Sequence, residues 1–177
     1  MLWPFNRFRN ATQPRNTIEA IYGMIVAQAR EPAFYARLNV PDTVNGRFDM
    51  LLLHLWMVLR QLRTGEDSEA MGQALFDRFC ADMDDNLREM GVGDLTVPKR
   101  MKEFGEAFYG RAAAYDAALA AGDKELALAI GRNILDSPHH ASASRIAAYV
   151  KDALATLTPL GRDALLAAGW RFPAPPI

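Results

Sequence analysis

The sequence predicts an all-α fold, a single-domain bundle of about seven helices with a central helical hairpin. Apolar residues recur at steps of three and four along most of the chain, which is the period of one helix face. No stretch alternates apolar and polar residues between hairpin turns, as strands do. The chain has 177 residues, half of them hydrophobic, so one domain can bury a substantial core. We expect the helical domain to span residues 16–169.

Two tails flank this domain. The N-terminal tail, residues 1–15, mixes aromatic side chains with arginines and two prolines. That mixture suits an anionic membrane surface, and it suits equally a disordered tail or one folded back on the domain. The C-terminal tail, residues 170–177, is too rich in proline to be helical. It either straps across the domain or stays mobile.

Two helices are predicted near the N-terminus. The first covers residues 16–29, where Asn16 and Glu19 have the spacing of a capping box and an apolar stripe follows. Pro32 ends that helix and begins a short one over residues 32–38, which a second proline terminates.

The helix predicted next, capped by Asp42 or Thr43 and running to about Arg63, is apolar on nearly all sides. Its apolar run, residues 48–62, is interrupted by charged residues and is shorter than the ~20 residues that cross a bilayer. Two interpretations compete: a fully packed core helix, or one wall of a groove that receives an apolar client segment. We expect a core helix, because soluble proteins seldom expose a large apolar patch.

The central hairpin begins with a helix over residues 74–90. Its predicted core face consists of Leu75, Phe76, Phe79, Cys80, Met83, Leu87 and Met90. Its predicted solvent face consists of Asp77, Asp82, Asp84, Asp85, Arg88 and Glu89. Gly91 suits a left-handed helix end, so the turn is expected at Gly91-Val92-Gly93.

The second hairpin helix is expected to start at Thr96 or Val97, with Pro98 in its first turn. The same turn carries three cations at the positive end of the helix dipole, where each is disfavoured by roughly 0.3 to 1 kcal/mol. These cations are Lys99, Arg100 and Lys102. Either the acidic end of the preceding helix compensates them, which we expect, or an acidic partner or a membrane headgroup does.

Further along this helix, Gly105 and Gly110 each cost about 1 kcal/mol relative to alanine. Close packing against a neighbouring helix would explain them, as would direct contact with a partner. Asp123 is expected to cap the following helix. After one more helix, Thr158-Pro159 is expected to start the last one, which ends at Gly169.

Composition restricts the cellular setting and the partners. The formal net charge is -1 and the sequence pI is about 6.3, which argues against DNA binding. Cys80 is the single cysteine, so an intramolecular disulfide is excluded and a reducing compartment fits. No secretory signal is recognisable at the start of the sequence. We therefore expect a cytoplasmic protein, at most peripheral on the inner face of the cytoplasmic membrane.

The residues that could carry catalysis or hold a metal do not form a known pattern. His54 has no companion ligand at helical spacing, so a buried histidine bonded to a neighbour is favoured over a metal ligand. His139 and His140 are adjacent, which suits a helix start better than zinc binding. An acidic helix face can bind a divalent cation, but the Glu-x-x-His signature of a di-iron centre is missing. We predict no metal, no cofactor and no catalytic residue.

Three segments carry a resemblance to a known family: FDMLLLHLWMVLRQLR, ALFDRFCADMDDNLREMGVGDLTVPKRMKEFGEAFYGR and AAAYDAAL. They are similar to the ubiquinol-cytochrome c chaperone family, the helical assembly factors of the respiratory bc1 complex. The similarity is most specific in DMDDNLREMGVGD followed by VPK and FYGR, and it spans roughly residues 17 to 135. The resemblance implies a bacterial member without catalytic activity. Mitochondrial members bind newly made cytochrome b and hold it for assembly.

The resemblance therefore implies a chaperone whose client is nascent or newly inserted cytochrome b. The family's motif falls here on the residues we predict to bind partners: Asp82, Asp85, Asn86, Arg88, Lys99, Arg100, Tyr109 and Arg111. Mitochondrial members also have a long N-terminal extension and a smaller partner protein, and we expect this chain to lack the extension. Partner dependence and ribosome contact near the membrane stay open. The alternative is a small helical metal- or cofactor-binding protein that uses His54 and the acidic helix face.

Overall fold

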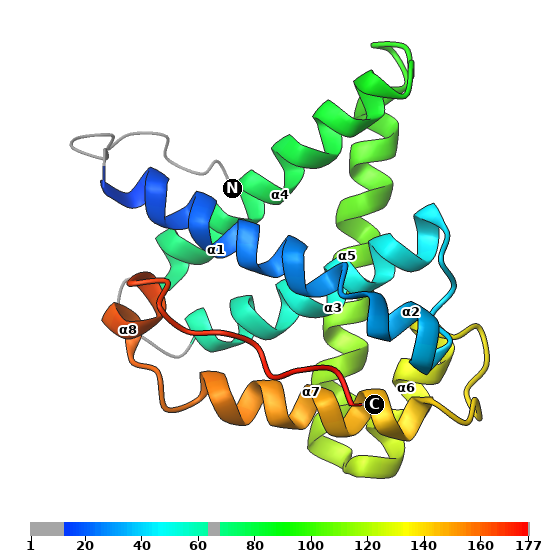
Figure 1. Ribbon diagram of the computed structural model, residues 1–177. Coiled ribbons are helices and arrows are strands. Elements are labelled where there is room, and N and C mark those ends of the chain that lie inside the picture. Colours follow the sequence, from blue (N-terminus) through cyan, green and yellow to red (C-terminus); the bar gives the residue numbers. More distant parts are fainter. Residues whose placement is uncertain (1–12, 64–67, 177) are drawn as a thin grey trace.

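The computed structural model describes residues 13–63 and 68–176, and these residues form eight helices and no strand (Figure 1). The helices are α1 (Gln13–Ala29), α2 (Pro32–Leu38), α3 (Val44–Leu62), α4 (Ser68–Glu89), α5 (Val97–Ala121), α6 (Asp123–Ile134), α7 (Ala143–Leu157) and α8 (Arg162–Leu166). The predicted all-α fold is confirmed, and the number of helices is close to the predicted seven.

Helix α1 begins at Gln13, before the predicted start at Asn16. Pro14 fits the first turn, where the missing N–H costs little. The predicted capping box is wrong, because Asn16 and Glu19 both lie inside the helix. Glu19 instead accepts two hydrogen bonds of 2.8 Å from Nε of Arg78, which joins α1 to α4.

Helix α3 is the centre of the core, and the prediction of a fully packed helix is confirmed. The Oγ1 of Thr43 caps it by accepting a hydrogen bond from the Gly46 amide at 3.1 Å. Every residue from Met50 to Val58 is buried, beneath α1 and α4 to α7. No helix within residues 13–63 or 68–176 is both long enough and apolar enough to span a membrane.

Helices α4 and α5 form the predicted hairpin, and its turn projects away from the other helices (Figure 1). Gly91 has a φ of 78°, the left-handed geometry expected at the end of α4. The α5 helix begins at Val97, as predicted. Aromatic rings join the two helices near their middle, where Phe76 packs against Phe108 with centroids 5.2 Å apart.

Two predicted helix starts after the hairpin are wrong. Asp123 is the first residue of α6 rather than its cap, a position taken by Gly122, and its carboxylate pairs with Lys151 at 2.7 Å. Thr158 ends α7 instead of starting α8, because its amide and its hydroxyl both bond to the Leu154 carbonyl. The last helix therefore begins only after Gly161.

The C-terminal tail straps across the domain, one of the two alternatives drawn from the sequence. It runs between α1 and α7 (Figure 1), where Gln28 of α1 donates a hydrogen bond to the Pro173 carbonyl at 3.0 Å. Trp170 and Phe172 of the tail are buried. The membrane-surface hypothesis for residues 1–15 concerns residues 1–12, which lie outside the described residues, and the first turn of α1.

Candidate functional site

Asp82, one of the predicted partner-binding residues, lies in the contact between α4 and α1. Its carboxylate accepts a hydrogen bond from the Tyr22 hydroxyl at 2.9 Å, and Arg78 lies 3.8 Å away. Burial and the bond to Asp82 together raise the pKa of Tyr22. Asp82 thus holds two helices together, whereas the sequence predicted it on the solvent face.

The other predicted residues of α4 lie at the exposed end of the helix. Asp85 is exposed, and it makes no ion pair with any described residue. Asn86 donates a hydrogen bond to the Asp82 carbonyl at 2.6 Å. Arg88 bridges Asp84 at 2.5 Å and Asp94 of the turn at 2.6 Å. Asp85 and Asn86 therefore belong to an open surface, while Arg88 stabilises the turn.

The cations in the first turn of α5 are exposed as well. Arg100 pairs with Glu103 at 3.0 Å, and Lys102 lies 3.6 Å from Glu106. The expected compensation by the acidic end of α4 is therefore wrong for these two, because their partners belong to α5 itself. Within residues 13–63 and 68–176, Lys99 has no ion pair.

Tyr109 and Arg111 differ although both match the family motif. Tyr109 is 62% exposed, and its ring packs on Phe76 with centroids 5.5 Å apart. Arg111 turns inward to Asp49 of α3 at 2.6 Å. Its Nε and the hydroxyl of Tyr115 are buried without a hydrogen-bond partner among the described residues. Tyr109 can contact a partner directly, whereas Arg111 belongs to the α3–α5 contact.

Asp49 and His54 are titratable groups on α3; His54 is fully buried, and the Asp49 side chain is 14% exposed. Desolvation raises the pKa of Asp49 to about 6, even though the Arg111 guanidinium lowers it. Desolvation lowers the pKa of His54 to about 4. The imidazole nitrogens of His54 lie 2.8 Å from the Met50 carbonyl and 2.8 Å from the Tyr149 hydroxyl. The prediction of a buried, bonded histidine is confirmed, and neither nitrogen is free for a metal.

Helical glycines decide one question that the sequence left open. A Cβ built on Gly105 or on Gly110 would meet no atom within 4 Å. Close helix packing therefore does not explain these two glycines, and the alternative of partner contact stands. Gly105 lies four residues before the exposed Tyr109 in α5, and Gly110 directly follows it.

Sequence reasoning missed two exposed apolar residues beside the turn. Leu95 is 98% exposed and Met90 is 66% exposed. The prediction that Met90 faces the core is wrong, because α4 extends past the helices that would cover it (Figure 1). Their exposure could have been predicted from the sequence, because both residues lie beside a turn that contains glycines, and residues in turns are seldom buried.

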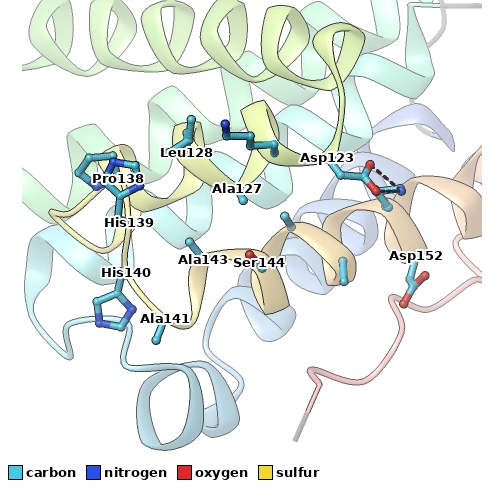
Figure 2. A pocket seen from close by; sticks show the side chains of 14 residues that line it. Asp123, Ala127, Leu128, Pro138, His139, His140, Ala141, Ala143, Ser144 and Asp152 are labelled. Atoms are coloured by element: carbon cyan, nitrogen blue, oxygen red, sulfur yellow. Dashed lines mark hydrogen bonds and ion pairs between the residues drawn. The ribbon is translucent and has the colours of Figure 1, made fainter.

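A cleft lies elsewhere, between α6 and α7 (Figure 2). It encloses about 660 Å³ and is lined by alanines of both helices, with the Asp123–Lys151 ion pair on its rim. His140 is one of its lining residues and accepts a hydrogen bond from the Ser142 amide at 3.1 Å, so it serves the start of α7 as predicted. In the chain as described, no three His, Cys, Asp or Glu side chains gather as metal ligands.

Comparison with known proteins accounts for most of the chain. A family model described as "Ubiquinol-cytochrome C chaperone" matches residues 36–172, which include the whole hairpin. The chain belongs to the ubiquinol-cytochrome c chaperone family. The resemblance that rested on the hairpin segments is thereby confirmed.

Relatives in this chaperone family include eukaryotic and bacterial proteins. The chain is 28% identical to "Ubiquinol-cytochrome-c reductase complex assembly factor 1" of Xenopus laevis over 85% of this chain and 78% of that one. The identity to the Homo sapiens protein of that name is also 28%, over 85% of this chain and 52% of that one. The chain thus spans only about half of the human relative.

A solved structure supports the fold of this family member. The chain matches the crystal structure of "the Cbp3 homolog from Brucella abortus" with a TM-score of 0.82 and 38% identity. The match covers 92% of this chain and 91% of the other. The two proteins therefore share the arrangement of helices over nearly their full lengths.

Proposed function

We propose that this protein is a non-enzymatic assembly chaperone that binds newly made cytochrome b and assists assembly of the ubiquinol-cytochrome c reductase complex. The observation that carries the proposal is the family match over residues 36–172. Relatives that cover most of this chain bear the name of assembly factors for that complex, which supports the same role. The proposal that cytochrome b is the client rests on the resemblance of the hairpin motif to that of the chaperone family.

The surface we propose for the client is the exposed side of the hairpin. It comprises Asp85, Asn86, Lys99, Arg100 and Tyr109. The other three motif residues support this surface without joining it. Asp82 fixes α4 to α1, Arg88 fixes the turn, and Arg111 fixes α5 to α3.

Recognition on this surface combines one aromatic anchor with unpaired charges. Tyr109 offers a large exposed ring between two glycines, and such anchors often contribute ~2 kcal/mol or more to binding. Asp85 and Lys99 lie on different helices and lack ion-pair partners in residues 13–63 and 68–176. Exposed ion pairs contribute only about 0.2 to 1 kcal/mol each. The charges therefore orient a client segment, and the ring supplies most of the affinity.

The test is affinity purification of the tagged protein from its native membranes in mild detergent, followed by mass spectrometry. We expect enrichment of cytochrome b with the wild type and its loss in Tyr109→Ala and in the double variant Asp85→Lys/Lys99→Glu. The matched control is Lys124→Glu/Asp152→Lys, which reverses two exposed charges on other helices. Unchanged capture by the hairpin variants would show that this surface is not the client site. Ribosomal proteins in the same sample would report ribosome contact.

The alternative function, a metal- or cofactor-binding bundle, would use His54 and the acidic helix face, and two of those side chains have protein partners among the described residues. Both ring nitrogens of His54 have protein partners, and Asp82 of the acidic face is bonded to Tyr22. Metal analysis and an absorption spectrum of the purified protein test the point. A stoichiometric metal or haem would contradict the non-enzymatic assignment.

A further inference from the structure

The C-terminal strap, residues 170–176, is held by side chains rather than by backbone pairing. Among the described residues, no backbone–backbone hydrogen bond joins it to a helix. Its two aromatic rings are buried, and Gln28 of α1 donates a hydrogen bond to the Pro173 carbonyl at 3.0 Å. Near its end, Arg145 of α7 donates to the Pro176 carbonyl at 3.2 Å. Burial of the rings favours the docked strap and chain entropy opposes it, so the loss of one hydrogen bond changes how often the strap is docked.

The Gln28 amide also connects the strap to a hydrogen-bond chain in the core. Its Nε2 donates to the Tyr149 hydroxyl at 3.0 Å as well as to Pro173. The Tyr149 oxygen lies 2.8 Å from Nε2 of His54, whose Nδ1 lies 2.8 Å from the Met50 carbonyl. The chain therefore runs from α3 through α7 and α1 to the strap. None of its residues belongs to the hairpin, so the chain is separate from the proposed client surface.

The two ends of this chain determine the direction of each hydrogen bond in it. A carbonyl oxygen only accepts, so Nδ1 of His54 carries the ring proton and the nitrogen of the Gln28 amide faces the strap. Neutral His54 then has no proton on Nε2, which accepts the hydrogen bond from Tyr149. The Tyr149 oxygen accepts in turn from Gln28. With His54 neutral, every donor in the chain thus meets an acceptor.

The surroundings of His54 favour its neutral form. The ring is fully buried, and Phe34 of α2 and Phe172 of the strap pack edge to face with it, at centroid distances of 5.6 and 5.1 Å. Tyr149 is the titratable group in contact with it, and burial raises the pKa of that phenol, as does Glu31 between α1 and α2, so the phenol keeps its proton. In the described part of the chain, no acidic or basic side chain pairs with the imidazole.

We propose that this chain is a proton-operated latch, in which a proton on Nε2 of His54 reverses the hydrogen bonds and releases the C-terminal strap. The proton makes Nε2 a donor, so the Tyr149 oxygen accepts from it and the Tyr149 proton turns to Gln28. Gln28 accepts that proton only through its amide oxygen, and the rotated amide sets this oxygen against the Pro173 carbonyl oxygen. Two acceptors form no hydrogen bond, so the contact with the strap is lost. Release of Phe172 admits water to His54, which favours the charged form further.

The first test follows the strap by fluorine NMR of the full chain labelled with fluorinated tryptophan. The resonance of Trp170, assigned with Trp170→Phe, reports the strap, and that of the buried Trp56 reports the core. His54 has a pKa of about 4 when buried against an ordinary 6.5, so the docked state loses stability as pH falls through this range. The ratio of released to docked strap should rise about tenfold or more between pH 7 and pH 4.5, while the Trp56 resonance stays in place. A Trp170 resonance that changes only together with that of Trp56 would overturn the proposal.

A variant of Gln28 imitates the reversed chain without a proton on His54. Gln28→Glu presents only acceptors to the strap, and Gln28 is half-buried on α1, so the variant should fold. The ratio of released to docked strap at pH 7 should rise about fivefold or more over the wild type. The matched control is Arg145→Gln, which changes the other side-chain contact of the strap and leaves the chain intact, so it should keep the wild-type pH response. A docked strap in Gln28→Glu at pH 7, or a lost pH response in Arg145→Gln, would contradict the latch.

The tautomer of His54 provides a check on the wild type that needs no variant. Nitrogen NMR of the histidine side chains at pH 7 should show the proton of His54 on Nδ1, because the Met50 carbonyl requires a donor there. A proton on Nε2 at that pH would reverse the direction of the chain and overturn the proposal. Neither outcome depends on client capture, so failure of the latch and failure of the proposed function are distinguishable.

Discussion

Helix α3 and the hairpin tip, defined as residues 88–102, both carry large apolar side chains, and they use them in opposite ways. Along α3, nine consecutive residues from Met50 to Val58 are buried under five other helices. At the tip, Met90 and Leu95 face solvent. The first region supplies stability, since burial of an aliphatic or aromatic side chain contributes roughly 1.5–3 kcal/mol. The second contributes almost none, so its sequence is free to serve contacts with other molecules.

The largest effect is expected when one side chain is truncated in each region and the losses of stability are compared. Trp56→Ala should lower the free energy of unfolding by about 3–5 kcal/mol. The indole is buried, packs on Tyr115 with centroids 5.2 Å apart and donates to Asp116 at 3.1 Å. Leu95→Ala should change the same quantity by less than about 0.5 kcal/mol. Urea unfolding followed by circular dichroism measures both, and a large loss in Leu95→Ala would contradict the contrast.

A glycine on α3 tests how tightly that region is packed. A Cβ on Gly46 would lie 2.0 Å from the Pro41 carbonyl oxygen, so backbone must move to admit it. Gly46→Ala should therefore lower the free energy of unfolding by about 1–3 kcal/mol, despite the better helix propensity of alanine. The thermal midpoint would fall accordingly. An unchanged thermal midpoint would mean that the backbone around Gly46 and Pro41 can move at little cost to admit the methyl group.

Asp49 and His54 of α3 make opposite contributions to the pH dependence of stability. His54 has a folded pKa of about 4 against an ordinary 6.5, so it destabilises the fold as pH falls from about 6.5 to about 4. Asp49 has a folded pKa of about 6 against an ordinary 3.9, so it stabilises the fold as pH falls from about 6 to about 4. In the wild type the two effects oppose each other.

Asp49→Asn should reveal the contribution of His54 to the pH dependence of stability. Without the carboxyl, the free energy of unfolding should fall more steeply between pH 7 and pH 4.5, by about 1–2 kcal/mol relative to the wild type. Urea unfolding at the two pH values measures the difference. Parallel pH profiles for the two proteins would show that Arg111 at 2.6 Å keeps the pKa of Asp49 near its ordinary value.

The sequence predicted best what depends on local rules. The cap at Thr43, the left-handed Gly91 and the start of α5 follow from residue types at fixed positions, and they are found as predicted. The apolar character of α3 on nearly all sides also predicted its burial.

The sequence predicted less well the environment of residues whose contacts come from distant parts of the chain or that lie at the edge of the core. The partner of Asp82 is Tyr22, 60 positions away, and the partner of Arg111 is Asp49, 62 positions away. Periodicity gives the direction of a side chain and not what lies opposite. Met90 continues the apolar stripe of α4 but lies in the turn, one residue after α4 ends, and it is 66% exposed whereas Leu87 is buried. Exposure at the tip is thus a property of the assembled bundle.

The smallest predicted effect concerns Gly110→Ala in the hairpin, a variant in which stability and client binding should change in opposite directions. Gly110 lies inside α5 with a helical φ, and a Cβ there would meet no atom, so Gly110→Ala should raise the free energy of unfolding by about 0.5–1 kcal/mol. If α5 contacts the client beside Tyr109, the added methyl group should at the same time lower the capture of cytochrome b. Urea unfolding and the affinity purification described above measure the two quantities on one variant. A more stable protein with undiminished capture would mean that Gly110 serves neither packing nor the client.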